Sequence, residues 1–417
     1  MDIFDRIKNN PGAIGQWSKQ GHGYFMYPKL EGEIGAHMNF RGHSVLNWSL
    51  NNYLGLASIK ELKDLDLKSV EELGLSNPMG SRLMTGNSQI HEILENELAE
   101  FEGKEDSFVL NSFYPGVVSI IDSLIGRNDV VIYDPDVHSS IHDGIRLHPN
   151  NRRFTYLQNK IENLESQLKN ACETATKQNG GVLLITEGIL GLTGELVPLD
   201  KIAALKEKYD FRWIVCDPHG LGVLGENGAG AVEHFHVNKQ VDLIIGNFEK
   251  TFGLIGGFVA GEEDVISFLR YNMRTQTFSE AMPLVYANGV LNRLKYIIKH
   301  PELRDKLWTV VNALQHGLKE IGCDIGETAS PITPVLISIH NMQEALHLMM
   351  DLRENYNIFC VPIIFPFVQN GKVMIRFIPT ADHSLEDVKY TLDSMKKIMD
   401  NLKMGKYRDD TPIVEKN

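Results

Sequence analysis

Cysteine is scarce in this chain of 417 residues, and its four cysteines are Cys172, Cys216, Cys323 and Cys360. They are widely spaced and form no C-x-x-C pair, which argues against a zinc cluster and indicates a reducing compartment. Long hydrophobic runs are also missing, because no stretch approaches the roughly 18 consecutive apolar residues of a spanning helix. The polar start MDIFDRIKNN offers no apolar signal-peptide core. We therefore expect a cytoplasmic protein with at most peripheral membrane contact.

Basic residues are also few relative to acidic ones. The 41 Lys and Arg residues are outnumbered by 54 Asp and Glu residues, which gives a net charge of −13. This balance argues against nucleic acid or an anionic membrane as the main partner. The contents of 43% hydrophobic and 23% charged residues are ordinary for a globular enzyme, and the length allows two domains.

Short apolar runs and helical patterns alternate through the first two thirds of the chain. The runs, bounded by turn residues, are 107–111, 129–133, 181–186, 212–216 and 241–246. Because the runs are continuous, they predict strands covered on both faces, as in a parallel sheet. The helical patterns cover 90–103, 160–178 and 199–210. This alternation predicts a mostly parallel, doubly wound α/β domain.

After residue 284 the pattern changes to mixed strands and helices, which predicts a smaller α+β domain. We divide the chain into an N-terminal segment (1–50), a large domain (51–284), a C-terminal domain (285–405) and a tail (406–417). Ser384 and Asp387 predict a capping box for the last helix, over about 385–403.

Lys250 is the most informative single residue. It follows the apolar run VDLIIG and precedes a glycine cluster in GNFEKTFGLIGG. Open α/β sheets bind ligands at the carboxyl ends of their strands, and His219 follows the neighbouring run RWIVC at the same edge. A strand-end lysine near acidic and imidazole groups suits pyridoxal 5'-phosphate, which forms a Schiff base with an amine. The alternative is a surface lysine in a glycine-rich turn.

Eight stretches in order resemble one enzyme family. They are NNYLGLA (51–57), GSRLMTGNSQIHEILENELAEF (80–101), DPDVHSSIHDGIRL (134–147), TEGILGLTGELVPL (186–199), DPHGLGVLGENGAG (217–230), GNFEKTFGLIGGFVAG (246–261), FSEAMP (278–283) and IRFIPTADH (375–383). The family is that of the α-oxoamine synthases, which includes serine palmitoyltransferase, 8-amino-7-oxononanoate synthase, 5-aminolevulinate synthase and glycine acetyltransferase. The resemblance implies the aspartate-aminotransferase-like fold of pyridoxal-phosphate enzymes (fold type I).

The resemblance assigns roles by position. Lys250 matches the lysine that forms the Schiff base and moves the α-proton of the substrate. His138 matches the histidine that stacks on the pyridine ring, and His219 the one near the ring hydroxyl. Arg376 matches the arginine that clamps the substrate carboxylate, although a strand arginine taken alone is more often a surface residue. Asn51 matches a polar residue near that carboxylate.

Partners follow from the same resemblance. Ser279 matches a serine or threonine that reaches the cofactor phosphate of the partner subunit, which implies a homodimer with shared sites. The substrates implied are an amino acid and an acyl thioester carried by coenzyme A or by a carrier protein. Acyl transfer to serine, cysteate or glycine in lipid biosynthesis is the function that we expect. We expect no metal site, since the pair His138 and His142 lacks the carboxylate of a metal motif.

The cofactor pocket departs from the family pattern. Cys216 stands where the family has the aspartate that pairs with the pyridine nitrogen, and a thiol is a weak hydrogen-bond donor. Asp217 is a poor substitute, because adjacent strand residues point to opposite faces.

Three more pocket positions differ from the family. Gly191 replaces a serine beside the ring hydroxyl, and Asn247 replaces a threonine that binds the phosphate. Phe113 replaces a glycine in the phosphate turn, where we expect it to narrow the site, and Tyr114 keeps the family's aromatic. These departures leave the alternative of a divergent homologue that binds the cofactor weakly or not at all and acts as a regulatory or partner subunit. A further alternative is an aminotransferase, which shares the fold but fits the motif stretches less well.

Overall fold

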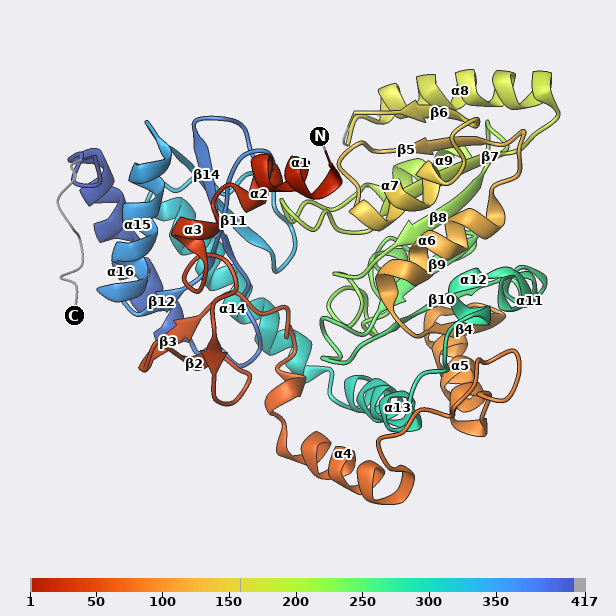
Figure 1. The fold of residues 1–417 in the computed structure, drawn as a ribbon, viewed down its shortest axis with the longest axis horizontal. Coiled ribbons are helices and arrows are strands. Elements are labelled where there is room, and N and C mark those ends of the chain that lie inside the picture. Colours follow the sequence, from red (N-terminus) through yellow and green to blue (C-terminus); the bar gives the residue numbers. More distant parts are fainter. Residues whose placement is uncertain (1, 158, 409–417) are drawn as a thin grey trace. The chain divides into compact units, whose positions relative to one another are not determined.

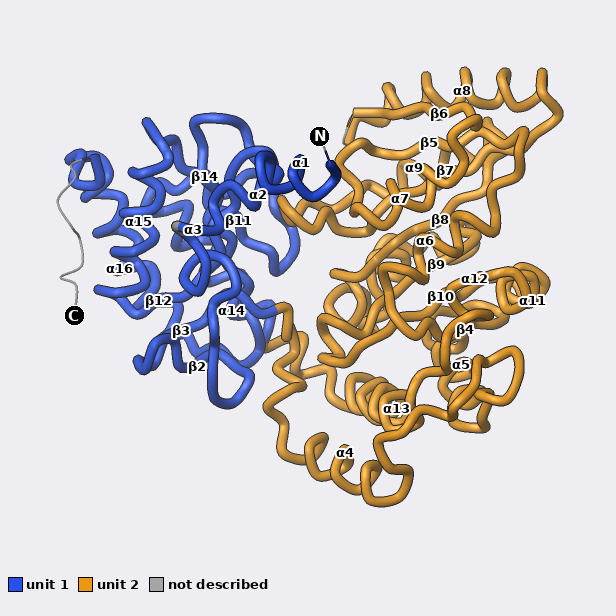
Figure 2. Tube along the Cα trace, viewed as in Figure 1, with its two compact units in different colours: residues 1–50, 307–417 blue, residues 51–306 orange. Residues whose placement is uncertain are grey.

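The computed structural model describes residues 2–157 and 159–408 and divides into two compact units (Figure 2). The larger unit is 51–306, and the smaller combines 1–50 with 307–417. The N-terminal segment joins the C-terminal residues because β3 (His43–Asn47) pairs in parallel with β12 (Ile358–Phe359). We expected the large domain to end at residue 284. The larger unit instead extends to residue 306, because α13 (Leu284–Lys299) packs on α4 (Lys60–Leu73) and α5 (Gln89–Glu102).

The larger unit is built on a seven-stranded sheet with strand order β4-β10-β9-β8-β7-β5-β6 (Figure 1). Its strands are β4 (Asp106–Leu110), β5 (Val130–Tyr133), β6 (Arg152–Thr155), β7 (Val182–Glu187), β8 (Arg212–Cys216), β9 (Leu243–Asn247) and β10 (Gly257–Gly261). Strands β6, β5, β7, β8 and β9 run parallel, while β10 is antiparallel to both of its neighbours. The predicted mostly parallel α/β sheet is confirmed.

Helices follow the parallel strands, as the alternating pattern predicts. Besides α4, α5 and α13, the larger unit contains η1 (Leu56–Ser58), α6 (Phe113–Leu124), α7 (Ser139–Arg146), α8 (Ile161–Gln178), α9 (Leu199–Leu205), α10 (Ala231–His234), α11 (Glu263–Asn272) and α12 (Arg274–Thr277). Apolar side chains of α6, α7 and α11 form one buried cluster with inward residues of the sheet. Because apolar side chains fill the space between these helices and the sheet, the polar residues of the candidate site stand at the strand ends.

The smaller unit contains two small sheets, β1-β2-β3-β12 and β11-β14-β13. Its other strands are β1 (Leu30–Glu31), β2 (His37–Phe40), β11 (Thr333–Ser338), β13 (Val361–Ile363) and β14 (Lys372–Phe377). Its helices are α1 (Ile3–Asn9), α2 (Gly12–Gly15), α3 (Ser18–Gly21), α15 (Met342–Glu354) and α16 (Leu385–Lys403), together with most of α14 (Glu302–Glu320).

Helix α16 begins with the capping box that the sequence predicts. The Ser384 hydroxyl accepts from the Asp387 N–H at 3.1 Å, and the Asp387 carboxylate accepts from the Ser384 N–H at 2.8 Å. Residues 409–417 of the expected tail lie outside the described residues. Within the described part of the chain, no helix combines the length and the apolarity that crossing a bilayer requires.

Candidate active site

The carboxyl ends of the parallel strands gather the polar residues of the larger unit. Glu187 ends β7, Cys216 ends β8 and Asn247 ends β9. Glu187 lies opposite Cys216 in the strand register, so their side chains leave the same face of the sheet. Lys250 follows Asn247 by three residues, at the same edge. The predicted location of Lys250 at the carboxyl edge of the parallel strands is therefore what the structure shows.

The Lys250 amine lies near a group of aromatic rings that begins with Phe113. Its Nζ lies 5.9 Å from the centroid of the Phe113 ring, and that ring lies 6.1 Å from the ring of His138. Tyr114 contacts His138 edge-on at 5.7 Å. Partial burial of the His138 ring, and to a lesser degree the Lys250 charge, lower the pKa of His138. A neutral imidazole beside the lysine is suited to stacking on a flat, electron-poor ring.

The N-terminus of α6 accepts an anion in this structure. The Phe113 N–H donates to the exposed Glu249 carboxylate at 3.4 Å, while the Ser112 side chain makes no capping bond. Unpaired N–H groups and the helix dipole make such a site favourable for phosphate as well. The Phe113 ring is 4% exposed and belongs to the buried apolar cluster, and it also lies 5.9 Å from the Lys250 Nζ. The expectation that this ring narrows the turn stays a prediction.

Asn247 supplies a second sign of a missing ligand. Its side chain is 2% exposed, and neither its amide nitrogen nor its amide oxygen has a hydrogen-bond partner among the described residues. A buried polar group left unpaired costs about 1–3 kcal/mol, so proteins keep one where a ligand completes it. Asn247 and the N-terminus of α6 both approach Gly257, where a Cβ would lie 3.3 Å from the Phe113 ring and 3.5 Å from the Asn247 Cα. The residues present fit the phosphate of pyridoxal phosphate.

His219 is held from two sides. The Tyr53 hydroxyl lies 2.7 Å from its Nδ1 and also donates to the Asn51 side chain at 3.5 Å. On the other side, a Cβ at Gly191 would lie 2.8 Å from its Nε2. Glycine at 191 is therefore what allows the imidazole its position, and a serine there would displace the ring. The structure thus brings His219 and Gly191 together, and Tyr53 links His219 to Asn51.

Cys216 is a neutral thiol. It is 2% exposed, and burial, followed by the negative charges of Glu187 and Asp217, raises its pKa well above the usual value. Asp217 does not replace the missing aspartate, because its carboxylate accepts from the N–H groups of Gly220 at 3.0 Å and Ala231 at 2.5 Å. Burial raises the pKa of Asp217 to about 6 in spite of these bonds. Its role is to hold the turn that carries His219.

Glu187 is the residue that sequence reasoning missed. It is 5% exposed, and burial raises the pKa of this carboxyl to about 8, although the Lys250 charge and a hydrogen bond from the His138 backbone oppose the shift. The available signal was its position directly after the apolar run 181–186, at the end of a parallel strand. The apolar run predicts that this strand ends at residue 186, whereas β7 ends at Glu187. Glu187 therefore belongs to the Lys250 cluster.

Two assigned residues belong to other elements, Ser279 to a loop of the larger unit and Arg376 to a strand of the smaller unit. Ser279 is exposed in the loop after α12, where the neighbouring Phe278 is 83% exposed. Arg376 is half-buried on β14 of the smaller unit, where it lies opposite Pro334 of β11 and Val361 of β13. Their roles toward the cofactor and the substrate remain proposals.

Comparison with known proteins agrees with this geometry. Residues 43–395 match the profile of the family described as aminotransferase class I and II. The cysteate-C-fatty acyltransferase of Capnocytophaga ochracea is 45% identical over 98% of this chain and 96% of its own length. The 8-amino-7-oxononanoate synthase of Petrotoga mobilis is 36% identical over 88% of this chain and 92% of its own.

A solved structure shares the fold. The serine palmitoyltransferase of Sphingomonas wittichii has a TM-score of 0.89 and 24% identity, and the match covers 97% of this chain and 99% of the other. The predicted fold class, that of the aspartate-aminotransferase-like enzymes, is confirmed. The chain belongs to the aminotransferase class I and II family and, within it, to the α-oxoamine synthases, which are pyridoxal-phosphate-dependent C-acyltransferases.

Proposed function

We propose that this chain condenses a small amino acid, cysteate in the first instance, with a fatty acyl thioester. The products are a 2-amino ketone, carbon dioxide and the free thiol. The high identity to a cysteate-C-fatty acyltransferase supports this choice over serine or glycine. One observation carries the proposal: Lys250 lies beside an anion-accepting helix N-terminus and near a buried, unpaired Asn247 amide.

Different residues of the larger unit bind the phosphate and the ring of pyridoxal phosphate. The N–H groups at the start of α6 and the Asn247 amide hold the phosphate, which displaces the Glu249 carboxylate. The His138 ring, which contacts Tyr114, would stack on the pyridine, and His219, fixed by Tyr53, would lie near the ring hydroxyl. When bound through Lys250, the cofactor withdraws electrons from the α-carbon of an amino acid.

Lys250 then acts as a base. With the cofactor bound, the Lys250 amine would remove the α-proton of the amino acid and would return a proton after carbon dioxide is lost. We assign the acid group of the substrate to Arg376, whose planar fork suits a bidentate contact. The new carbon–carbon bond forms at the thioester carbonyl, and the thiolate is the leaving group.

We also propose that the enzyme is a homodimer in which Ser279 reaches the partner's cofactor phosphate. The exposure of Ser279 and Phe278 supports an interface at this loop, because both side chains are accessible to a partner chain. Sedimentation of the cofactor-loaded enzyme measures the mass directly, and a monomeric mass in the active fraction contradicts this assembly.

A catalytically silent relative is the second candidate, and Cys216 is the observation that favours it. A neutral thiol at the position of the ring-nitrogen partner weakens the electron-withdrawing power of the cofactor. Such a protein binds its ligand and turns nothing over, so binding and turnover must be measured separately.

The test begins with the visible absorbance of the purified chain titrated with pyridoxal phosphate. We expect a Schiff-base band that Lys250→Ala abolishes and that the exposed-lysine control Lys239→Ala keeps. Cysteate and palmitoyl-coenzyme A are then added, and released thiol and carbon dioxide are measured in equal amounts. A missing band at saturating cofactor overturns the proposal, while a band without thiol release establishes the silent relative.

A further inference from the structure

The smaller unit contains an apolar pocket whose lining includes none of the residues assigned above. Its volume is about 280 Å³, and every residue lining it is apolar or glycine. One wall comes from α2, α3 and the turn after them, with Trp17 and Phe25. Leu346 and Met349 of α15 form the second wall, and Ile363 at the end of β13 begins the third.

The apolar side chains around this pocket are unusually open to water. Ile14, Phe365 and Phe367 line it with exposures of 58%, 62% and 60%. Large apolar side chains gathered around a hollow mark a binding surface. None of the described residues that line the pocket is charged, and Trp17 contributes only an indole N–H, so the pocket offers little to a polar ligand and suits a hydrocarbon chain.

The third wall is joined to the strand that carries Arg376. Val361 of β13 lies opposite Arg376 of β14, and Ile363 follows two residues later on the same side of the sheet. From the usual strand spacings, the Cα of Ile363 lies about 8 Å from that of Arg376. One small sheet therefore places the proposed acid-group clamp and the apolar pocket next to each other within a single unit.

We infer that this pocket binds the hydrocarbon tail of the fatty acyl donor and of the lipid product. The inference rests on the proposed function, since it takes a long acyl chain to be the substrate. Met26, Met342 and Met349 line the pocket with flexible side chains, which adapt to a chain that makes no directional contacts. The pocket volume corresponds to roughly nine water-sized groups at about 30 Å³ each, so it encloses part of a long chain.

Trp17 provides a reporter of binding, because it lines the pocket, while Trp48 and Trp213 are completely buried elsewhere and the partly buried Trp308 does not line the pocket. The cofactor-loaded enzyme is titrated with brominated fatty acids of 8 to 16 carbons, below the concentrations at which they form micelles. We expect quenching that Trp17→Phe removes. Affinity should rise about fourfold per methylene, from about 0.8 kcal/mol each, until the pocket is filled.

Ile363→Glu places a charge in the lining, and Leu385→Glu is the matched control at an exposed apolar position of the same unit. We expect Ile363→Glu to weaken the quenching ligand at least tenfold while the control leaves its affinity unchanged. In turnover, Ile363→Glu should lose the preference for palmitoyl-coenzyme A over butyryl-coenzyme A and keep the rate with the short donor.

The two readouts separate the inference from the proposed function. Quenching that is absent in the native chain, independent of chain length or unaffected by Ile363→Glu overturns the inference, even when both thioesters are turned over. A change of sedimenting mass in Ile363→Glu without any chain binding shows that a second copy occupies the pocket, which also overturns it. Chain-length-dependent quenching without turnover of either thioester supports the pocket and overturns the proposed function.

Discussion

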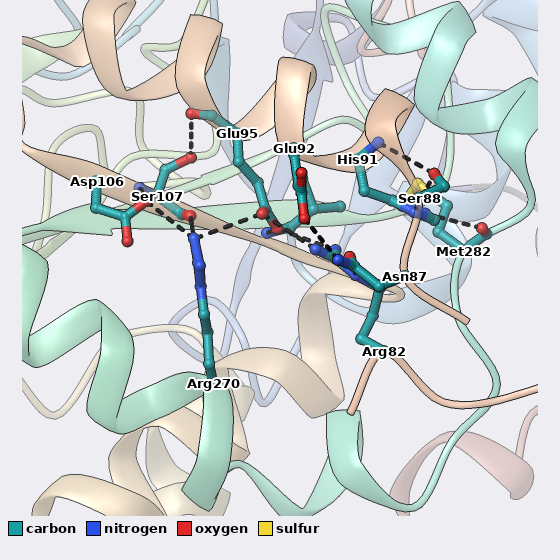
Figure 3. A network of polar contacts seen from close by, with 11 residues as sticks. Arg82, Asn87, Ser88, His91, Glu92, Glu95, Asp106, Ser107, Arg270 and Met282 are labelled. Carbon is teal, nitrogen blue, oxygen red and sulfur yellow. Dashed lines mark hydrogen bonds and ion pairs between the residues drawn. The ribbon is translucent and has the colours of Figure 1, made fainter. Parts of the chain in front are cut away.

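Two buried glutamates of the larger unit differ in how well the surrounding chain stabilises their negative charge. Glu95 on α5 has a side chain that is 3% exposed, and its carboxylate accepts from both Arg82 nitrogens at 2.9 and 3.0 Å, from Arg270 at 3.4 Å and from the Val109 N–H at 2.9 Å. Figure 3 shows Arg82 and Arg270 converging on it. Glu187 is equally buried, yet burial dominates and raises its pKa to about 8.

The difference distinguishes a structural ion network from a candidate binding site within one unit. Around Glu95 the charges are neutralised within the chain, so nothing is left for a ligand to complete. Around Lys250, by contrast, the chain keeps a poorly stabilised carboxyl and the unpaired amide of Asn247. Groups left in this state lower stability and are ready to bind a cofactor. Four substitutions test this contrast.

The largest effect is expected from breaking the Glu95 network. Arg82→Met removes the two-pronged partner of a carboxylate that stays buried, and we expect a loss of about 3–5 kcal/mol in the free energy of unfolding. Urea denaturation measures it. The control is Arg212→Met, whose arginine is 72% exposed in its pair with Asp242 and should cost at most about 1 kcal/mol. Equal losses in the two variants contradict the contrast.

The second effect is a change of pH dependence at Glu187. Its pKa is raised on folding, so its contribution to stability is present below about pH 4.5 and is lost as pH rises through about 8. In the ligand-free protein, Glu187→Gln should remove this loss, which amounts to on the order of 1 kcal/mol per pH unit over that window. Melting temperatures from pH 5 to 9 measure it, with the exposed Glu207→Gln as control. Parallel curves for native protein and Glu187→Gln show that Glu187 is stabilised like Glu95.

The sequence was sufficient to predict the strands and their carboxyl edge, but not how side chains pack around that edge. The apolar runs and Lys250 were sufficient to predict the parallel strands and the ligand-binding edge, because strand burial and strand-end chemistry are local patterns. The direction of the Phe113 ring and the burial of Glu187 were not predictable, since each depends on packing between elements far apart in sequence. The pairing of β3 with β12, which unites residues 1–50 with the C-terminal part, is of the same kind.

The third effect concerns the ring-nitrogen position. Cys216→Asp restores the carboxylate that the family has there, and an ionised partner favours a protonated ring nitrogen. We expect about tenfold tighter binding of pyridoxal phosphate, measured by titration of the visible band. Cys216→Ser is the control, because it is similar in size and remains neutral. Unchanged affinity in Cys216→Asp means that Cys216 does not face the ring nitrogen.

The smallest effect is expected at Asn247. Its substitution should stabilise the ligand-free protein and weaken the binding of pyridoxal phosphate. Asn247→Leu replaces two unpaired buried polar atoms by methyl groups, so the ligand-free protein should gain about 1 kcal/mol in the free energy of unfolding. The same change removes a phosphate contact, so the affinity for pyridoxal phosphate should fall. Denaturation without cofactor and titration with cofactor measure the two terms separately. A ligand-free protein that loses stability shows that Asn247 is paired within the fold, as Glu95 is, and removes it from the phosphate site.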